Sequence, residues 1–153
     1  NFWDEVYGVN MSCIKEWVLT EPIMDIVDPS VVITDTFKLR DFGLERITMD
    51  KLDFSCAYEL TAMESINAHA LVTWFELEFN YGPTDNVLSS SPFMPKTRWK
   101  QTIFYLKQRL ELKEGDHIHG SMAMKRVKYD KCANFKLSVH HGETSVLQYF
   151  TLN

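Results

Sequence analysis

Histidine pairs and paired carboxylates are the first residues of this sequence that could do chemistry. The stretches 117–119 and 140–141 carry two histidines each, and alternate strand residues project from one face, as shared metal ligands would. No cysteine pair or spaced carboxylate stands beside them to complete a coordination shell, so we expect surface histidines and no metal. Glu76 and Glu78 could hold a cation, but alternating acids are more typical of a solvated strand face.

A catalytic nucleophile and a phosphate-binding loop are not recognisable in the sequence. Cys13, Cys56 and Cys132 lack C-x-x-C spacing and an adjacent histidine, and no Gly-x-Ser-x-Gly motif occurs. The 6 glycines stand too far apart to cradle a phosphate. An odd number of separated cysteines indicates a reducing compartment rather than a disulfide framework. We therefore expect neither acyl-transfer chemistry nor a nucleotide-like cofactor held by a glycine-rich loop.

The composition and charge limit the classes of protein to which this chain can belong. A chain of 153 residues with 45% apolar and 24% charged residues is typical of one folded domain. The net charge of -5 gives no electrostatic reason for a nucleic-acid partner. No apolar run approaches the roughly 20 residues of a membrane span, and no signal segment begins the chain. We expect an intracellular protein that binds neither nucleic acid nor membrane directly.

The first 29 residues have the pattern of a helical arm. Glu21-Pro22 and Asp28-Pro29 break the pattern, because the residue before a proline avoids the helical conformation. Periodicity alone leaves two interpretations, since the apolar stripe could pack on the domain's own core or dock on another chain. The apolar residues at helical spacing are Trp3, Val6, Tyr7, Met11, Ile14, Trp17 and Val18.

After residue 29 the apolar pattern changes to a period of two. Residues 71–79, LVTWFELEF, alternate strictly and predict a half-buried strand. With no helix between the strands, residues 30–153 are expected to form an antiparallel β-barrel or sandwich-like domain. Further strands are expected at 31–39, 44–49, 52–62, 99–106, 109–113, 117–126, 133–140 and 144–152.

Several stretches resemble the C-terminal half of type I protein arginine N-methyltransferases. FWDEVYGVNMSCIKE at 2–16 and EPIMDIVDP at 21–29 are similar to the family's dimerisation arm. HALVTWFELEF at 69–79 is similar to a barrel strand, and SSSPFMPKTRWKQTIFYL at 89–106 is similar to a loop of Thr-His-Trp followed by Lys-Gln-Thr. These stretches occur in the family's order and spacing, and the resemblance spans nearly the whole chain. The resemblance implies an arm at 1–29 and a β-barrel substrate-binding domain at 30–153.

The resemblance also implies a position for the tripeptide Thr97-Arg98-Trp99. In the family this loop lies at the mouth of the active site and helps to shape the pocket for the substrate arginine. Thr97 and Trp99 match, whereas Arg98 stands where the family has histidine. Arg98 is a permanent cation and would repel a substrate guanidinium in a shared pocket, or it could pair with a carboxylate from elsewhere. The simpler alternative is that Trp99 begins a strand and Arg98 faces water.

The family transfers a methyl group from S-adenosylmethionine to a guanidinium nitrogen by direct displacement. Its cofactor pocket and its two substrate-binding glutamates belong to an N-terminal domain, which no stretch of this chain matches. The chain also begins at Asn1 within structured-looking sequence, so we expect a fragment that is inert alone. The implied substrates are proteins with arginine, including Arg- and Gly-rich ones, in the cytoplasm or the nucleus.

The resemblance implies that the arm contacts another subunit, in a homodimer or a hetero-oligomer. Two other interpretations stay open: a catalytically inactive partner that activates a related enzyme, suggested by Arg98, and a stand-alone β-barrel binding module. The implied contact residues are Trp3, Val6, Tyr7, Met11, Ile14, Trp17 and Met24.

Overall fold

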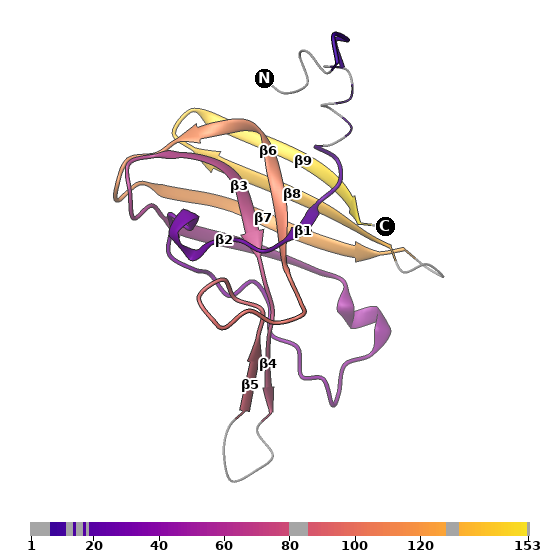
Figure 1. The fold of residues 1–153 in the computed structure, drawn as a ribbon. Helices are drawn as coiled ribbons and strands as arrows, with labels where there is room; N and C mark the ends of the chain where they lie inside the picture. Colours follow the sequence, from indigo (N-terminus) through magenta and orange to yellow (C-terminus); the bar gives the residue numbers. More distant parts are fainter. Residues whose placement is uncertain are drawn as a thin grey trace.

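The computed structural model describes residues 7–11, 14, 17, 19–79, 86–127 and 132–152, apart from the side chain of residue 50. Strands dominate this part of the chain, and two short 3-10 helices lie between the first strands (Figure 1). The elements in chain order are β1 (Ile23–Asp25), η2 (Pro29–Val31), η3 (Met49–Leu52), β2 (Phe54–Thr61), β3 (Asn67–Thr73), β4 (Glu76–Phe79), β5 (Asn86–Ser89), β6 (Gln101–Glu111), β7 (His117–Arg126), β8 (Ala133–His141) and β9 (Thr144–Leu152).

The strands form three antiparallel groups. A 3-stranded sheet has the order β1-β6-β3, a 4-stranded sheet has the order β2-β7-β8-β9, and β4 pairs with β5 in a separate hairpin. Figure 1 shows the 4-stranded sheet curving beneath β3 and β6, with the β4–β5 hairpin projecting away from both sheets. This arrangement confirms a mainly β, antiparallel fold.

The sheets do not close into a barrel. β6 and β9 lie side by side, but β9 is not paired with β6 in either sheet of the described chain. The buried Gln148 of β9 bridges them, since its Oε1 accepts from Lys107 N at 2.8 Å and its Nε2 donates to Tyr105 O at 3.2 Å. Of the two forms expected, barrel or sandwich-like, the closed barrel is therefore wrong, because a side chain takes the place of a backbone ladder at this seam.

The helical arm expected at 1–29 is not confirmed. Ile14 and Trp17 have helical backbone, but Trp3, Val6 and several residues between 12 and 18 lie outside the described part. The C-terminal part of the arm is extended, because β1 pairs with the start of β6 through Ile23 opposite Ile103. No helix among the described residues is long and apolar enough to cross a membrane.

Two expected strands, 31–39 and 44–49, do not form, and one is divided. Residues 31–46 contain a single bridge, Thr34 opposite Ala62. Asp35 ends the pairing there, because its carboxylate accepts from Thr61 N at 2.7 Å and replaces the next backbone acceptor. The expected strand 71–79 is divided into β3 and β4, since the chain exchanges β6 for β5 as its partner after Thr73.

The core lies between the 3-stranded and 4-stranded sheets. Phe104 of β6 is 1% exposed and occupies the centre of an aromatic group. Its ring lies 5.2 Å from that of Phe135 and 5.1 Å from that of Phe150, both in edge-to-face geometry. Because β6 meets β8 and β9 through these rings, the packing joins the two sheets. The other buried members of the core include Leu106, Leu110, Ile118, Met122, Leu137, Val139 and Val146.

Gly120 permits a close crossing within the core. Tyr58 of β2 lies opposite Gly120 of β7, and its hydroxyl donates to Ser138 O of β8 at 2.9 Å. Burial raises the pKa of the Tyr58 phenol, so this donor keeps its proton. A Cβ at Gly120 would collide with Ser138 O and the Tyr58 hydroxyl.

We therefore expect Gly120→Ala to lower the free energy of unfolding by about 2 to 3 kcal/mol, through overpacking and a displaced Tyr58 hydrogen bond. Urea denaturation measures this change. Gly43→Ala is the matched control, because no heavy atom lies within 4 Å of its added Cβ. Equal midpoints for the two variants would contradict the crossing described here.

Candidate functional site

The tripeptide Thr97-Arg98-Trp99 forms an ordered loop immediately before β6. Thr97 Oγ1 donates to Trp99 O at 3.0 Å, which closes the loop on itself. The Trp99 ring is half exposed and packs edge-to-face on Phe75, with ring centroids 6.1 Å apart. Arg98 is exposed, and no ion pair joins it to another residue in the described ranges. The loop therefore presents one cation and one aromatic edge to the surroundings.

A run of buried serines holds the backbone of Phe75, the residue on which the Trp99 ring packs. Ser89, Ser90 and Ser91 are all buried, and Ser90 hydrogen-bonds the backbone of Phe75. Gln101, also buried, donates from Nε2 to Ser90 O at 2.6 Å. The resemblance included Gln101 in the Lys-Gln-Thr match after the loop but implied no role for it.

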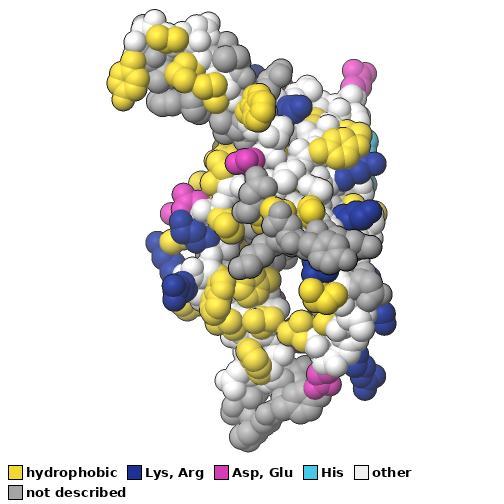
Figure 2. All heavy atoms as spheres, turned by 90° about the vertical axis from the view of Figure 1, so that its right-hand side faces the viewer, with side chains coloured by type: hydrophobic (Ala, Val, Ile, Leu, Met, Phe, Trp, Pro, Cys, Tyr) yellow, Lys and Arg dark blue, Asp and Glu magenta, His cyan; other side chains and the backbone are white. Residues whose placement is uncertain are grey.

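The described arm residues present apolar side chains to the surroundings. Tyr7 is fully exposed, Trp17 is 79% exposed and Met24 is 57% exposed, whereas Met11 and Ile14 are half-buried. Figure 2 shows hydrophobic side chains on the part of the molecule that extends from the two sheets. Trp3 and Val6 lie outside the described residues. The arm thus has the apolar surface expected of a contact region.

An ion pair joins the end of the arm to the loop. Asp25 of β1 accepts from Lys100 Nζ at 3.2 Å and from Ile26 N at 2.8 Å. The Ile26 hydrogen bond, assisted by the Lys100 ammonium, holds the pKa of the Asp25 carboxyl below its ordinary value of 3.8. The ionised carboxylate therefore stabilises the folded chain.

This lowered pKa predicts a pH-dependent effect of Asp25→Asn. A carboxyl group with a depressed folded pKa contributes stability above its unfolded pKa and loses that contribution as pH falls through the folded pKa. The variant should be less stable than the unmodified chain at about pH 7, and the difference should shrink at about pH 3. Urea midpoints at both pH values measure it, and an undiminished difference at low pH would contradict the assignment.

The histidine pairs lie at one end of the 4-stranded sheet. His117 Nδ1 is 3.1 Å and His119 Nδ1 is 3.9 Å from the Glu59 carboxylate, while His141 Nε2 is 2.9 Å from Asp116 Oδ2. No group of three potential ligands within the described ranges has a geometry that could hold a metal ion.

The Glu76 carboxylate accepts from Ser89 Oγ at 3.1 Å and so anchors the β4–β5 hairpin.

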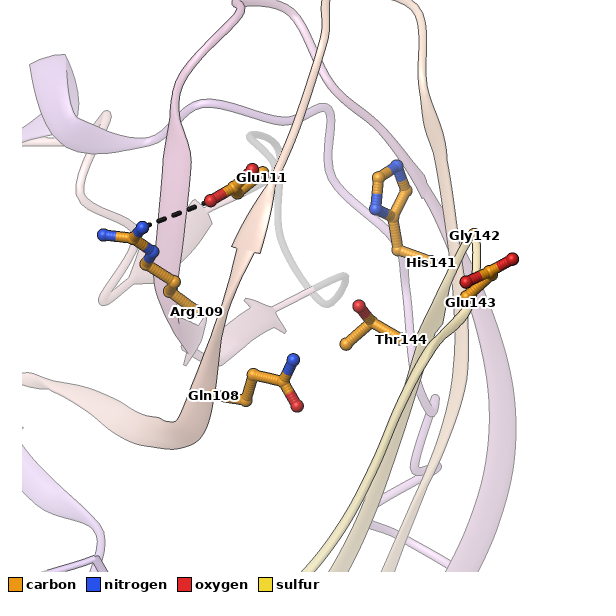
Figure 3. A pocket seen from close by; sticks show the side chains of 7 residues that line it. All are labelled: Gln108, Arg109, Glu111, His141, Gly142, Glu143 and Thr144. Carbon is orange, nitrogen blue, oxygen red and sulfur yellow. Dashed lines mark hydrogen bonds and ion pairs between the residues drawn. The ribbon is translucent and has the colours of Figure 1, made fainter.

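A small cleft of about 480 Å³ lies between β6 and the β8–β9 turn. Gln108 and Thr144 extend into it from opposite sides, whereas Arg109 pairs with Glu111 and Glu143 points outward (Figure 3). His141 is held by Asp116. The cleft therefore lacks a free acid–base pair that could act on a bound molecule.

A larger cavity of about 1350 Å³ lies between residues 31–46 and the inner sides of β2, β3, β6 and β7. Figure 2 shows hydrophobic side chains gathered around a hollow on this side. Its lining mixes apolar side chains from the strands with charged residues from 31–46. The missing strands at 31–39 and 44–49 leave this cavity open.

Sequence comparison places these features in a known protein class. The family model of the arginine methyltransferase oligomerization subdomain matches residues 1–143. The chain is 40% identical over 124 residues to protein arginine N-methyltransferase 1 of Caenorhabditis elegans, covering 81% of this chain and 36% of the relative. It is 35% identical over 125 residues to protein arginine N-methyltransferase 8-B of Danio rerio, covering 82% and 30%. The chain thus spans about a third of the length of these relatives.

Solved structures agree with this class. The chain superposes with a TM-score of 0.93 and 28% identity on a chain of the Trypanosoma brucei PRMT1 enzyme-prozyme heterotetrameric complex with AdoHcy, covering 100% of this chain and 50% of that one. It superposes with a TM-score of 0.80 and 15% identity on Arabidopsis thaliana protein arginine methyltransferase 10, covering 95% and 48%, a likeness of fold alone.

The two-sheet domain with an extended arm is therefore of the arginine methyltransferase oligomerisation type. The chain belongs to the arginine methyltransferase oligomerization subdomain family, which confirms the resemblance seen in the sequence.

Proposed function

We propose that residues 1–153 are the C-terminal part of an S-adenosylmethionine-dependent protein arginine N-methyltransferase. The observation that carries this proposal is the family match over residues 1–143. The named relatives in nematode and zebrafish support it, since both are protein arginine N-methyltransferases. The parent protein transfers a methyl group to a guanidinium nitrogen of arginine in protein substrates.

Within that enzyme, residues 1–29 act as the dimerisation arm and residues 30–153 act as the substrate-binding domain. The loop Thr97–Trp99 lines the active-site mouth, where the half-exposed Trp99 ring offers an apolar contact for the substrate. S-adenosylmethionine is held by another part of the parent protein, and the described residues of this chain position substrate rather than cofactor.

The substrates are proteins that present arginine in flexible, Arg- and Gly-rich segments. The net charge of -5 is compatible with such cationic partners because opposite charges favour encounter. The sequence contains no disulfide framework, which is compatible with a location in the reducing cytoplasm or nucleus.

The arm joins this subunit to another subunit, in a homodimer or a hetero-oligomer. Exposed Trp17 and Met24 support this role, because large apolar side chains are typical anchors of an interface. The family description names oligomerisation, and the similar Trypanosoma brucei chain belongs to a heterotetrameric complex.

A second candidate function is a catalytically inactive partner of an active methyltransferase. Arg98 favours it, since a permanent cation at the mouth opposes a substrate guanidinium. The Trypanosoma brucei complex also contains a prozyme beside its enzyme. The third interpretation, a stand-alone module of another class, loses its support because the family match covers most of the chain.

Methyl transfer by the purified full-length parent protein separates the first two candidates. Radiolabelled S-adenosylmethionine and an Arg- and Gly-rich peptide are the substrates, and Arg98→His is assayed beside the unmodified chain. Robust transfer by the unmodified chain supports the enzyme and excludes the inactive partner. Lys96→His is the matched control, because it makes the same kind of exchange two positions away. No transfer by the unmodified chain would contradict the enzyme proposal.

A further inference from the structure

We propose that Gln101 is the positioning residue for Trp99, acting through Ser90 and Phe75, and that it couples Trp99 to the arm. The role of Trp99 at the substrate rests on the proposed function, whereas the coupling itself rests on geometry alone. The Gln101 amide joins the arm end and the serine run to the start of β6, and Ser90 extends this network to the strand break after β3.

Gln101 makes two directed hydrogen bonds from a buried position. Gln101 is only 5% exposed. Its Oε1 accepts from Val27 N at 2.8 Å, and its Nε2 donates to Ser90 O at 2.6 Å. A glutamine amide holds its acceptor oxygen and its donor NH2 group in one plane, so the two backbone partners are fixed relative to each other. Loss of the amide would leave two buried backbone groups without this partner.

Ser90 passes this constraint to Phe75 through three contacts. Ser90 N donates to Phe75 O at 3.0 Å. Ser90 Oγ accepts from Phe75 N at 3.2 Å and lies 3.3 Å from Phe75 O. Phe75 occupies the break between β3 and β4, where the sheet ladder gives its backbone no partner strand. Ser90 therefore fixes the backbone at the position that carries the Phe75 ring.

The Phe75 ring in turn supports Trp99. The two rings meet edge-to-face at 78°, with centroids 6.1 Å apart. Such a contact depends on angle and distance, so a shift of the Phe75 backbone moves the surface on which the indole packs. The Thr97–Trp99 hydrogen bond closes the loop but involves only the Trp99 backbone. The indole orientation consequently follows Phe75.

The arm joins the same network at its C-terminal end. β1 pairs with the first residues of β6, with Asp25 opposite Gln101, and Asp25 also binds Lys100. Val27, two residues after Asp25, donates from its backbone N–H to the Gln101 amide oxygen. A displacement of the arm on binding another subunit therefore reaches Gln101 without passing through the rest of the sheet. Gln101 therefore links the arm, which takes part in subunit assembly, to the segment that orients Trp99.

The test uses 19F NMR of the full-length parent protein labelled with 5-fluorotryptophan. Trp99→Phe assigns the Trp99 resonance by its disappearance. Gln101→Met removes both hydrogen bonds at nearly constant volume, and Gln101→Glu keeps an acceptor for Val27 N while losing the donor to Ser90 O. Ser90→Ala removes the Oγ contacts to Phe75.

Gln148→Met is the matched control. Gln148 is also buried and also bridges two backbone groups, but these belong to Tyr105 and Lys107 at the β6–β9 seam and not to the arm or the serine run. Both methionine variants should lose thermal stability, whereas only the Gln101 variant should alter Trp99.

The expected result is a shifted or doubled Trp99 resonance in both Gln101 variants and in Ser90→Ala, and an unchanged one in Gln148→Met. An unchanged Trp99 resonance in folded Gln101→Met, or an equal change in Gln148→Met, overturns the proposal. If Gln101→Met does not fold, Ser90→Ala decides in the same way.

Activity gives a second and separable readout. In an active parent enzyme kcat/KM should fall about 10²-fold in Gln101→Met, because a displacement of about 1 Å at the reacting centre has such an effect. Gln148→Met should keep its kcat/KM. Absence of methyl transfer in the unmodified protein would contradict the proposed function, while the NMR result would still decide whether Gln101 positions Trp99.

Discussion

Replacing Phe104 with alanine is expected to lower the free energy of unfolding by about 3 to 5 kcal/mol. The ring is 1% exposed and contacts both Phe135 and Phe150, so its removal leaves a cavity where the two sheets meet. Urea denaturation of the 153-residue chain measures the change.

Phe79→Ala is the control for this prediction. Phe79 ends β4 and is 56% exposed, so its truncation should change the free energy of unfolding by less than about 1 kcal/mol. A loss of similar size in both variants would mean that the Phe104 contacts do not hold the sheets together.

The double substitution Trp17→Ala/Met24→Ala is expected to disrupt subunit assembly. Both side chains are exposed in the single chain, and large anchor side chains buried at an interface contribute about 2 kcal/mol or more each. Loss of two such anchors should raise the dissociation constant about 10³-fold. Sedimentation of the full-length parent protein over a concentration series measures this constant.

Phe37→Ala/Met63→Ala is the matched double variant. It also removes one exposed aromatic residue and one exposed methionine, at 44% and 50% exposure, but outside the arm. Its dissociation constant should equal that of the unmodified protein. Equal weakening by both doubles would show that general surface apolarity, not the arm, drives assembly.

The C-terminal strands were predictable because the period of two in their sequence arises from side chains that alternate between the core and the opposite face of the sheet. β7, β8 and β9 form a meander in which alternate residues face the core, and their bounds agree closely with 117–126, 133–140 and 144–152. The stretch 31–49 also looked strand-like, yet a strand needs a partner as well as a pattern. Asp35 occupies the backbone position where that pairing would continue.

The site was only partly predictable, for a similar reason. The resemblance identified the Thr97–Trp99 loop, and the structure places Trp99 on Phe75, from a strand that the alternation had treated as continuous. The role of Gln101 arises from contacts with Val27 and Ser90, which lie 74 and 11 residues away along the chain. No local pattern encodes such a contact, since residue type alone does not show which backbone groups will meet.

The measurement that tests the central claim most directly is photo-cross-linking from the loop to a substrate peptide. The full-length parent protein carries p-benzoylphenylalanine in place of Trp99, and a second sample carries it in place of Tyr149, an exposed aromatic residue of β9. Each is irradiated with an Arg- and Gly-rich peptide and analysed by mass spectrometry. A chain whose loop lines the substrate path cross-links from position 99 and not from position 149. Cross-linking from position 149 alone, or from neither position despite measured peptide binding, would contradict the account.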